Sequence, residues 1–218
     1  MKIKYLRTIL LDSAFFIGLI TVIVYLRSRV RDFLLLLQDY VPTLNNLDPN
    51  QDILKTQNIL NNINTTATTA YFFVFLIIPL IIFIFYLVTQ GLSFYFLKKE
   101  KNYIKKFILA SLLPYILFII LITNFNYILL IFFVITSYLS FVLYFKNLKE
   151  LKLALTKIYK LFPFYLLYLI LVLLALSGFF ITYISIISKV EFFGFLALGV
   201  LSTMLFSLYK LYLVKKLS

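Results

Sequence analysis

TILLDSAFFIGLITVIVYL, residues 8–26, is an apolar run that contains a single charged side chain, Asp12. A helix of about 20 predominantly apolar residues crosses the roughly 30 Å hydrocarbon core of a bilayer, so this run predicts a transmembrane helix. Further runs of the same kind follow at 71–89, 107–123, 127–145, 163–187 and 192–214. Together they predict an all-α, polytopic integral membrane protein. Residues 1–218 would then form a single membrane domain, a six-transmembrane-helix bundle.

The composition supports this assignment. Of the 218 residues, 63% are hydrophobic and 13% are charged, and the mean hydropathy is +1.03, which is far from the composition of an ordinary soluble domain. The formal net charge of +13 would suggest nucleic acid binding in a soluble protein. Here, however, the basic residues lie in short clusters between the apolar runs, a pattern that sets membrane orientation. We therefore expect no nucleic acid partner.

The distribution of Lys and Arg predicts how the chain is threaded. If both termini are cytoplasmic, most of the 21 basic residues fall on the cytoplasmic side, many of them in the basic loops 98–106 and 146–162. An excess of Lys and Arg in cytoplasmic loops is the usual arrangement. The sequence thus predicts a multi-pass protein of the cell (cytoplasmic) membrane with its N- and C-termini in the cytoplasm.

The longest connection, residues 27–70, is predicted to be an extracytoplasmic helical hairpin between the first two spans. Pro42 is expected to end its first helix, and Asp48 and Pro49 are typical of the cap and first position of its second. The hairpin can serve as a docking platform for a partner or a lipid, or simply as a cover over the helix ends. Asn64, in the triplet Asn-Thr-Thr, is a candidate glycosylation site.

The segment 146–162 has the pattern of an amphipathic helix edged with lysines. Its apolar stripe predicts a helix in the headgroup layer, with lysines contacting anionic lipid on the cytoplasmic side. A docking site for an acidic cytosolic partner is the alternative. The stripe consists of Leu148, Leu151, Leu155, Ile158 and Phe162, and the predicted lipid-contacting lysines are Lys149, Lys152, Lys157 and Lys160.

Asp12 and Lys210 lie at the same predicted depth, each four residues from the cytoplasmic end of its span. Ionisable groups inside a membrane usually find partners or line a wet path, so the two can form an intramembrane ion pair. In the alternative interpretation both lie near the boundary, where Lys210 reaches the headgroups and Asp12 bonds to local hydroxyls.

Small residues recur on the last two spans at helical spacing. Such stripes let backbones approach closely, which drives helix association where the hydrophobic effect is absent. A substrate path is the alternative. The predicted helix-packing residues are Ala175, Gly178, Thr182 and Ser185 on one span and Gly199, Thr203 and Ser207 on the other.

The sequence lacks the residues that most membrane enzymes use. It contains no His and no Cys, and we find no Gly-rich phosphate loop, no serine elbow and no paired intramembrane carboxylates. We therefore expect no catalytic residue, no metal site and no cofactor. The remaining interpretation is a non-catalytic scaffold or assembly subunit, with protein partners in a membrane complex.

Two other functions stay open. One is a small transporter or channel component, although the middles of most spans are Leu, Ile and Phe. The size and number of spans are similar to those of the substrate-binding subunits of energy-coupling-factor vitamin transporters. The first span carries only Ala14 where that family has paired alanines, so the family is not assigned. The other function is a lipid-binding or lipid-modifying protein, suggested by 17 Tyr and 25 Phe together with the lysines.

Overall fold

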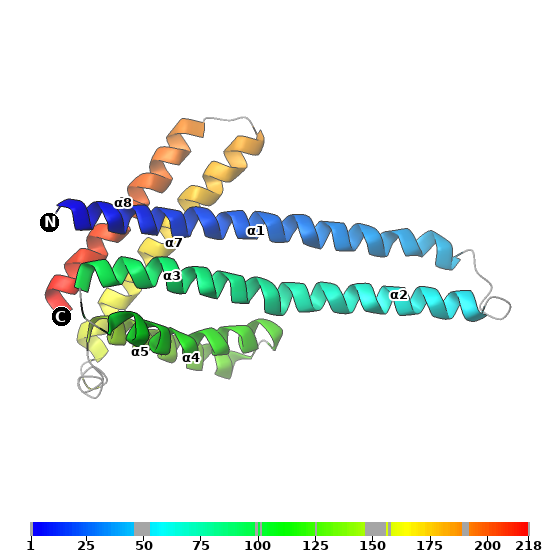
Figure 1. Ribbon diagram of the computed structural model, residues 1–218, viewed down its shortest axis with the longest axis horizontal. Coiled ribbons are helices and arrows are strands. Elements are labelled where there is room, and N and C mark those ends of the chain that lie inside the picture. The colour runs from blue at the N-terminus through cyan, green and yellow to red at the C-terminus, as the bar shows by residue number, and fades with distance from the viewer. Residues whose placement is uncertain are drawn as a thin grey trace. The chain divides into compact units, whose positions relative to one another are not determined.

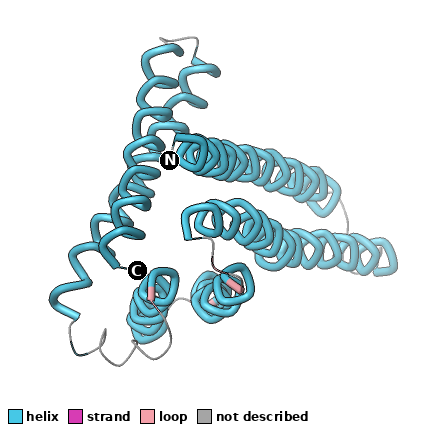
Figure 2. The backbone as a smooth tube through the Cα atoms, turned by 60° about the vertical axis from the view of Figure 1, so that its left-hand side comes forward, coloured by secondary structure: helices cyan, strands magenta, loops and turns pink. Residues whose placement is uncertain are grey.

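The computed structural model describes residues 2–45, 53–98, 100, 102–124, 126–146, 156, 158–188 and 192–217. Figure 1 shows its helices, and Figure 2 draws no strand in the described part of the chain. The prediction of an all-α protein is confirmed. The elements are α1 (Lys2–Asn45), α2 (Ile53–Phe72), the π-helical turn η1 (Phe73–Ile77), α3 (Ile78–Lys98), α4 (Tyr103–Thr123), α5 (Tyr127–Phe145), α7 (Ile158–Ser188) and α8 (Phe192–Leu217).

In the described part of the chain, six stretches of helix are long and apolar enough to cross a membrane, which confirms the predicted number. They are Lys4–Pro42, Ile53–Lys98, Tyr103–Thr123, Tyr127–Phe145, Tyr159–Ser185 and Phe193–Leu217. The fourth of these stretches is α5, which begins at Tyr127. Asn126 caps α5 there, because its side chain accepts a 2.9 Å hydrogen bond from the backbone N–H of Ile128.

The first helix is much longer than one span. α1 has 44 residues, which at about 1.5 Å per residue is more than twice the roughly 30 Å of bilayer hydrocarbon. Pro42 was expected to end this helix, and that prediction is wrong because α1 runs through Pro42 to Asn45. A proline removes only one backbone hydrogen bond, and this one lies in the last turns of an otherwise regular helix. Asp48 and Pro49 lie outside the described residues.

The second span is also part of a longer helix. α2, η1 and α3 follow one another without a break from Ile53 to Lys98. The π-helical turn ends directly before Ile78 and Pro79, where the proline has no N–H to give to the preceding turn. The π-helical turn η1 therefore lies directly before Pro79, while α3 continues through Gln90 and Gly91.

The chain divides into two compact units. The second unit, Thr21–Ile82, contains the far part of α1 together with α2 and η1. Its ring contacts join Tyr25 and Phe33 of α1 to Phe73, both at 6.3 Å between centroids. Of the segment 27–70, residues 27–45 belong to α1 and residues 53–70 belong to α2. Asn64 is exposed on α2.

The first unit comprises Met1–Ile20 and Phe83–Ser218. It contains the start of α1, most of α3, and the antiparallel pairs α4/α5 and α7/α8 (Figure 1). Its core is aromatic, and the most deeply buried rings are Phe16, Phe94, Tyr103, Phe107, Phe141, Phe145 and Phe206. Large aliphatic and aromatic side chains are exposed on every helix of this unit.

The two basic segments are partly helical continuations of their neighbours. α4 begins at Tyr103, so the end of the segment 98–106 is its first turn. Likewise Ile158–Phe162, predicted as the end of a separate amphipathic helix, forms the start of α7. Lys160 is exposed there, with its ammonium 5.7 Å from the centroid of the Tyr159 ring. Three other predicted lipid-contacting residues, Lys149, Lys152 and Lys157, lie outside the described residues, as do Leu148, Leu151 and Leu155.

Candidate functional site

Three helices of the first unit place polar side chains around one buried point. α1 contributes Asp12, α3 contributes Gln90 and Ser93, and α8 contributes Ser207 and Lys210. Within α3 and within α8 the two residues are three positions apart, so each pair lies on one helical face. The exposed fraction is 1% for Gln90 and 0% for the other four side chains.

The centre of this cluster is an ion pair. Lys210 Nζ lies 2.7 Å from Asp12 Oδ1, so the structure brings together the two residues that were predicted to pair across helices. Lys210 also donates to Gln90 Oε1 at 2.8 Å and to Ser93 Oγ at 2.7 Å. Asp12 accepts from Ser93 Oγ at 2.9 Å and from Ser207 Oγ at 2.7 Å. We call these five residues the Asp12 cluster.

Hydrogen bonding in the Asp12 cluster is nearly complete. An ammonium group has three protons to donate, and Lys210 gives them to three acceptors on α1 and α3. Both carboxylate oxygens of Asp12 accept. The rings of Phe94 and Phe206 lie 4.4 Å and 5.1 Å from the Lys210 ammonium and add a cation–π contribution. A buried ion pair is stable only when its remaining protons and lone pairs are bonded in this way.

One atom of the cluster is the exception. Gln90 Nε2 is buried and has no hydrogen-bond partner among the described residues. The amide cannot be turned to correct this, because its Oε1 accepts from Lys210 and exchanging the two atoms would set one donor against another. The cluster therefore contains one unsatisfied amide donor beside the ion pair.

A second buried polar cluster lies between α3, α4 and α5 and contains only neutral groups. The hydroxyl of Tyr144 is 3.0 Å from that of Tyr86 and 2.9 Å from Ser111 Oγ. Tyr103 donates to the backbone carbonyl of Tyr144 at 2.9 Å. We call these four residues the Tyr144 cluster. Its members were not predicted, because nothing in the sequence distinguishes them from the other 14 Tyr and the other serines of the chain.

The predicted packing residues on α7 and α8 are all buried. Gly178 of α7 faces Gly199 of α8 so closely that a Cβ atom on Gly178 would lie 2.9 Å from the Cα of Gly199. The hydroxyls of Thr182 and Thr203 bond within their own helices, to the carbonyls of Gly178 and Gly199. Ala175 and Ser185 belong to the same buried face. Ser207 differs from the other packing residues, since its hydroxyl reaches Asp12 on α1.

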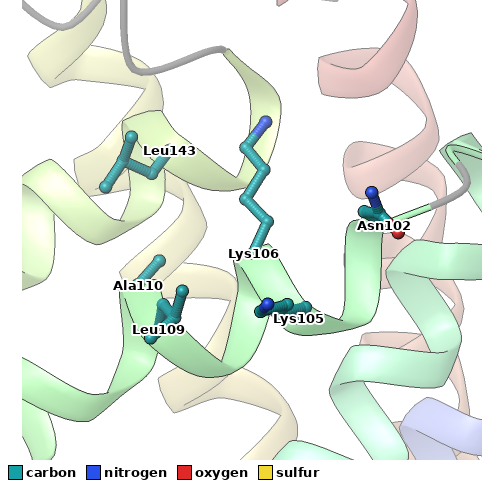
Figure 3. Close-up of a pocket in the computed structure, with 6 residues that line it drawn as sticks. All are labelled: Asn102, Lys105, Lys106, Leu109, Ala110 and Leu143. Atoms are coloured by element: carbon teal, nitrogen blue, oxygen red, sulfur yellow. The ribbon is translucent and has the colours of Figure 1, made fainter.

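A surface pocket of about 460 Å³ lies at the start of α4, beside the end of α5 (Figure 3). Its lining is formed by Asn102, Lys105, Lys106, Leu109, Ala110 and Leu143. None of these residues belongs to the Asp12 cluster. The pocket therefore does not open onto the buried ion pair.

Comparison of the chain with protein-family models, with characterised proteins and with solved structures finds no match in any of the three. The geometry of the chain itself is thus the basis for a functional proposal.

Proposed function

We propose that this chain is a multi-pass protein of the cell membrane that acts as a non-catalytic scaffold or assembly subunit. Its six apolar helices cross the bilayer with both termini in the cytoplasm. Their outer surfaces, rich in exposed Leu, Ile and Phe, contact lipid and the helices of partner subunits. Anionic lipids hold the basic cytoplasmic segments at the membrane surface.

The observation that carries the proposal is the complete hydrogen bonding of the two charged groups, Asp12 and Lys210. A charged group that performs chemistry or moves an ion must exchange partners during its cycle. All three protons of the Lys210 ammonium are instead bonded to α1 and α3, and both oxygens of Asp12 are bonded to α3 and α8. Such an arrangement joins three helices in one geometry and supports a structural role.

The predicted threading can be tested with introduced thiols, because the chain contains no cysteine. Asn64 and Lys215 are both exposed, on α2 and at the end of α8. We expect N64C to react with a membrane-impermeant maleimide in intact cells, and K215C to react only after the cells are opened. The reverse pattern would overturn the orientation. Recovery of the purified protein as a monodisperse species in buffer without detergent would overturn membrane insertion.

The scaffold role is tested by affinity purification of the full chain in a mild detergent, followed by identification of the bound proteins. We expect another membrane protein in stoichiometric amount. Recovery of a nucleotide-hydrolysing subunit in that amount would overturn the scaffold role in favour of transport. Recovery of the chain with no partner under conditions that preserve known complexes would also overturn it.

One observation favours a second function, a component of a transporter. The unsatisfied Gln90 Nε2 beside the ion pair is the kind of donor that a substrate or a water path would use. To separate the two functions, S93C is placed in the cluster and exposed to a charged thiol reagent from each side of membrane vesicles. A scaffold leaves S93C unlabelled, whereas a wet path labels it. K215C is the positive control, because labelling of this exposed thiol shows that the reagent is active.

A further inference from the structure

We infer that the pocket at the start of α4 binds one molecule of an anionic phospholipid. The inference rests on the proposed insertion in a membrane and adds a specific ligand to it. The site differs from the lysines of the segment 146–162, because it is a defined cavity on another pair of helices. The six residues that line this pocket are labelled in Figure 3.

The order of polar and apolar groups along the pocket matches that of a phospholipid. Lys105 and Lys106 lie in the first turn of α4, and Leu109 and Ala110 lie one turn further into the same helix (Figure 3). One turn is about 5.4 Å. In the proposed threading the start of α4 is its cytoplasmic end. The polar groups then lie at headgroup depth and the apolar groups at the depth of the first acyl carbons.

The charge at the polar end favours an anion. Lys105 is exposed and has no ion-pair partner among the described residues, while Lys106 lies 4.0 Å from Glu100. The same carboxylate lies 3.3 Å from Lys98, so one negative charge is shared between two lysines and the local charge stays positive. The side chain of Asn102, at the pocket rim, forms no cap bond with α4. The helix N-terminus therefore adds to the positive potential.

The size and floor of the pocket favour a lipid over a free phosphate ion. A volume of about 460 Å³ falls in the range of cavities that hold small organic ligands. Leu109, Ala110 and Leu143 supply the apolar part of the lining. The carbonyl of Ala110 also accepts a hydrogen bond from Ser140 of α5. This bond holds the two helices that form the pocket in a fixed relation.

The test is native mass spectrometry of the full chain in detergent, titrated with phosphatidylglycerol or with phosphatidylcholine of identical acyl chains. We expect one phosphatidylglycerol to be retained at concentrations where phosphatidylcholine is not. K105Q should weaken its binding about fivefold, the effect expected for one lysine beside an anionic group. L109W should abolish it, because Leu109 is 64% exposed and the larger ring covers the pocket without disturbing the core.

Two matched controls keep the result specific. K215Q removes an exposed lysine from α8, and L113W adds a ring at an exposed position of α4 that does not line the pocket. Both should bind phosphatidylglycerol like the parent chain. Equal retention of the two lipids, or equal effects of K105Q and K215Q, would overturn the inference. Full displacement of the lipid by millimolar inorganic phosphate would show a free-anion site and would also overturn it.

Failure of this inference is distinguishable from failure of the proposed function. Loss of lipid selectivity in a protein that still requires detergent and still recovers its membrane partner would remove only the lipid site. If the protein needs no detergent, membrane insertion fails first.

Discussion

The two buried polar clusters of the first unit each join three helices, but they do so with different chemical groups. The Asp12 cluster joins α1, α3 and α8 through a charged pair, whereas the Tyr144 cluster joins α3, α4 and α5 through hydroxyls alone. Both are surrounded by aromatic rings: Lys210 is next to Phe94 and Phe206, and Tyr144 is stacked on Phe107 at 4.6 Å between centroids.

The two clusters differ in how strongly their stability depends on every group keeping its hydrogen-bonding partner. A hydroxyl can act as donor or acceptor, so the loss of one neighbour leaves the Tyr144 cluster with other arrangements. A carboxylate and an ammonium have fixed roles, and a charge without its partner costs several kcal/mol in an apolar interior. The loss of one member should therefore destabilise the charged cluster more than the neutral one.

The largest effect is expected from D12A, which strands the Lys210 ammonium in the core. We expect the free energy of unfolding, measured in mixed micelles of a mild and a denaturing detergent, to fall by about 3–5 kcal/mol. The double variant D12A/K210A should be less destabilised than D12A alone, because it leaves no unpaired charge. Strictly additive effects in this double-mutant cycle would show that the two residues do not interact.

The second prediction concerns Ser207 of α8, whose hydroxyl donates a hydrogen bond to Asp12. S207A removes a hydrogen bond to a charged acceptor, so we expect a loss of about 1.5–3 kcal/mol in the same assay. The matched control is S202A on the same helix, where the hydroxyl bonds to the carbonyl of Leu198 one turn away and to no other described residue. Equal effects of S207A and S202A would mean that the Ser207 bond to Asp12 adds nothing.

The comparison also explains what could be predicted from the sequence. A charge inside an apolar run is rare and therefore conspicuous, and helix register sets its depth, so Asp12 and Lys210 could be matched. The partners Gln90 and Ser93 could not be matched to them. Their spacing of three positions in α3 places them on one face, but no local signal tells which of the other helices packs against that face.

The helix lengths show the same limit. The apolar runs predicted six spans because burial in hydrocarbon requires a minimum length. Nothing in those runs predicted how far α1 would continue, because a helix does not need to end where a membrane does. Residues 27–41 contain no Gly or Pro to end it, and the single proline at position 42 is tolerated.

The smallest effect is expected in the neutral cluster. Y144F removes one hydroxyl that contacts Tyr86 and Ser111. Hydrogen bonds between membrane helices contribute about 0.6 kcal/mol on average. The two bonds here join neutral groups, so we expect a loss of about 1 kcal/mol. Y212F is the control, because Tyr212 is exposed and its hydroxyl, among the residues that the structure describes, bonds only to Lys216 one turn along α8. A loss for Y144F as large as that for D12A would contradict the distinction between charged and neutral clusters, since it would mean that the number of bonds matters more than their charge.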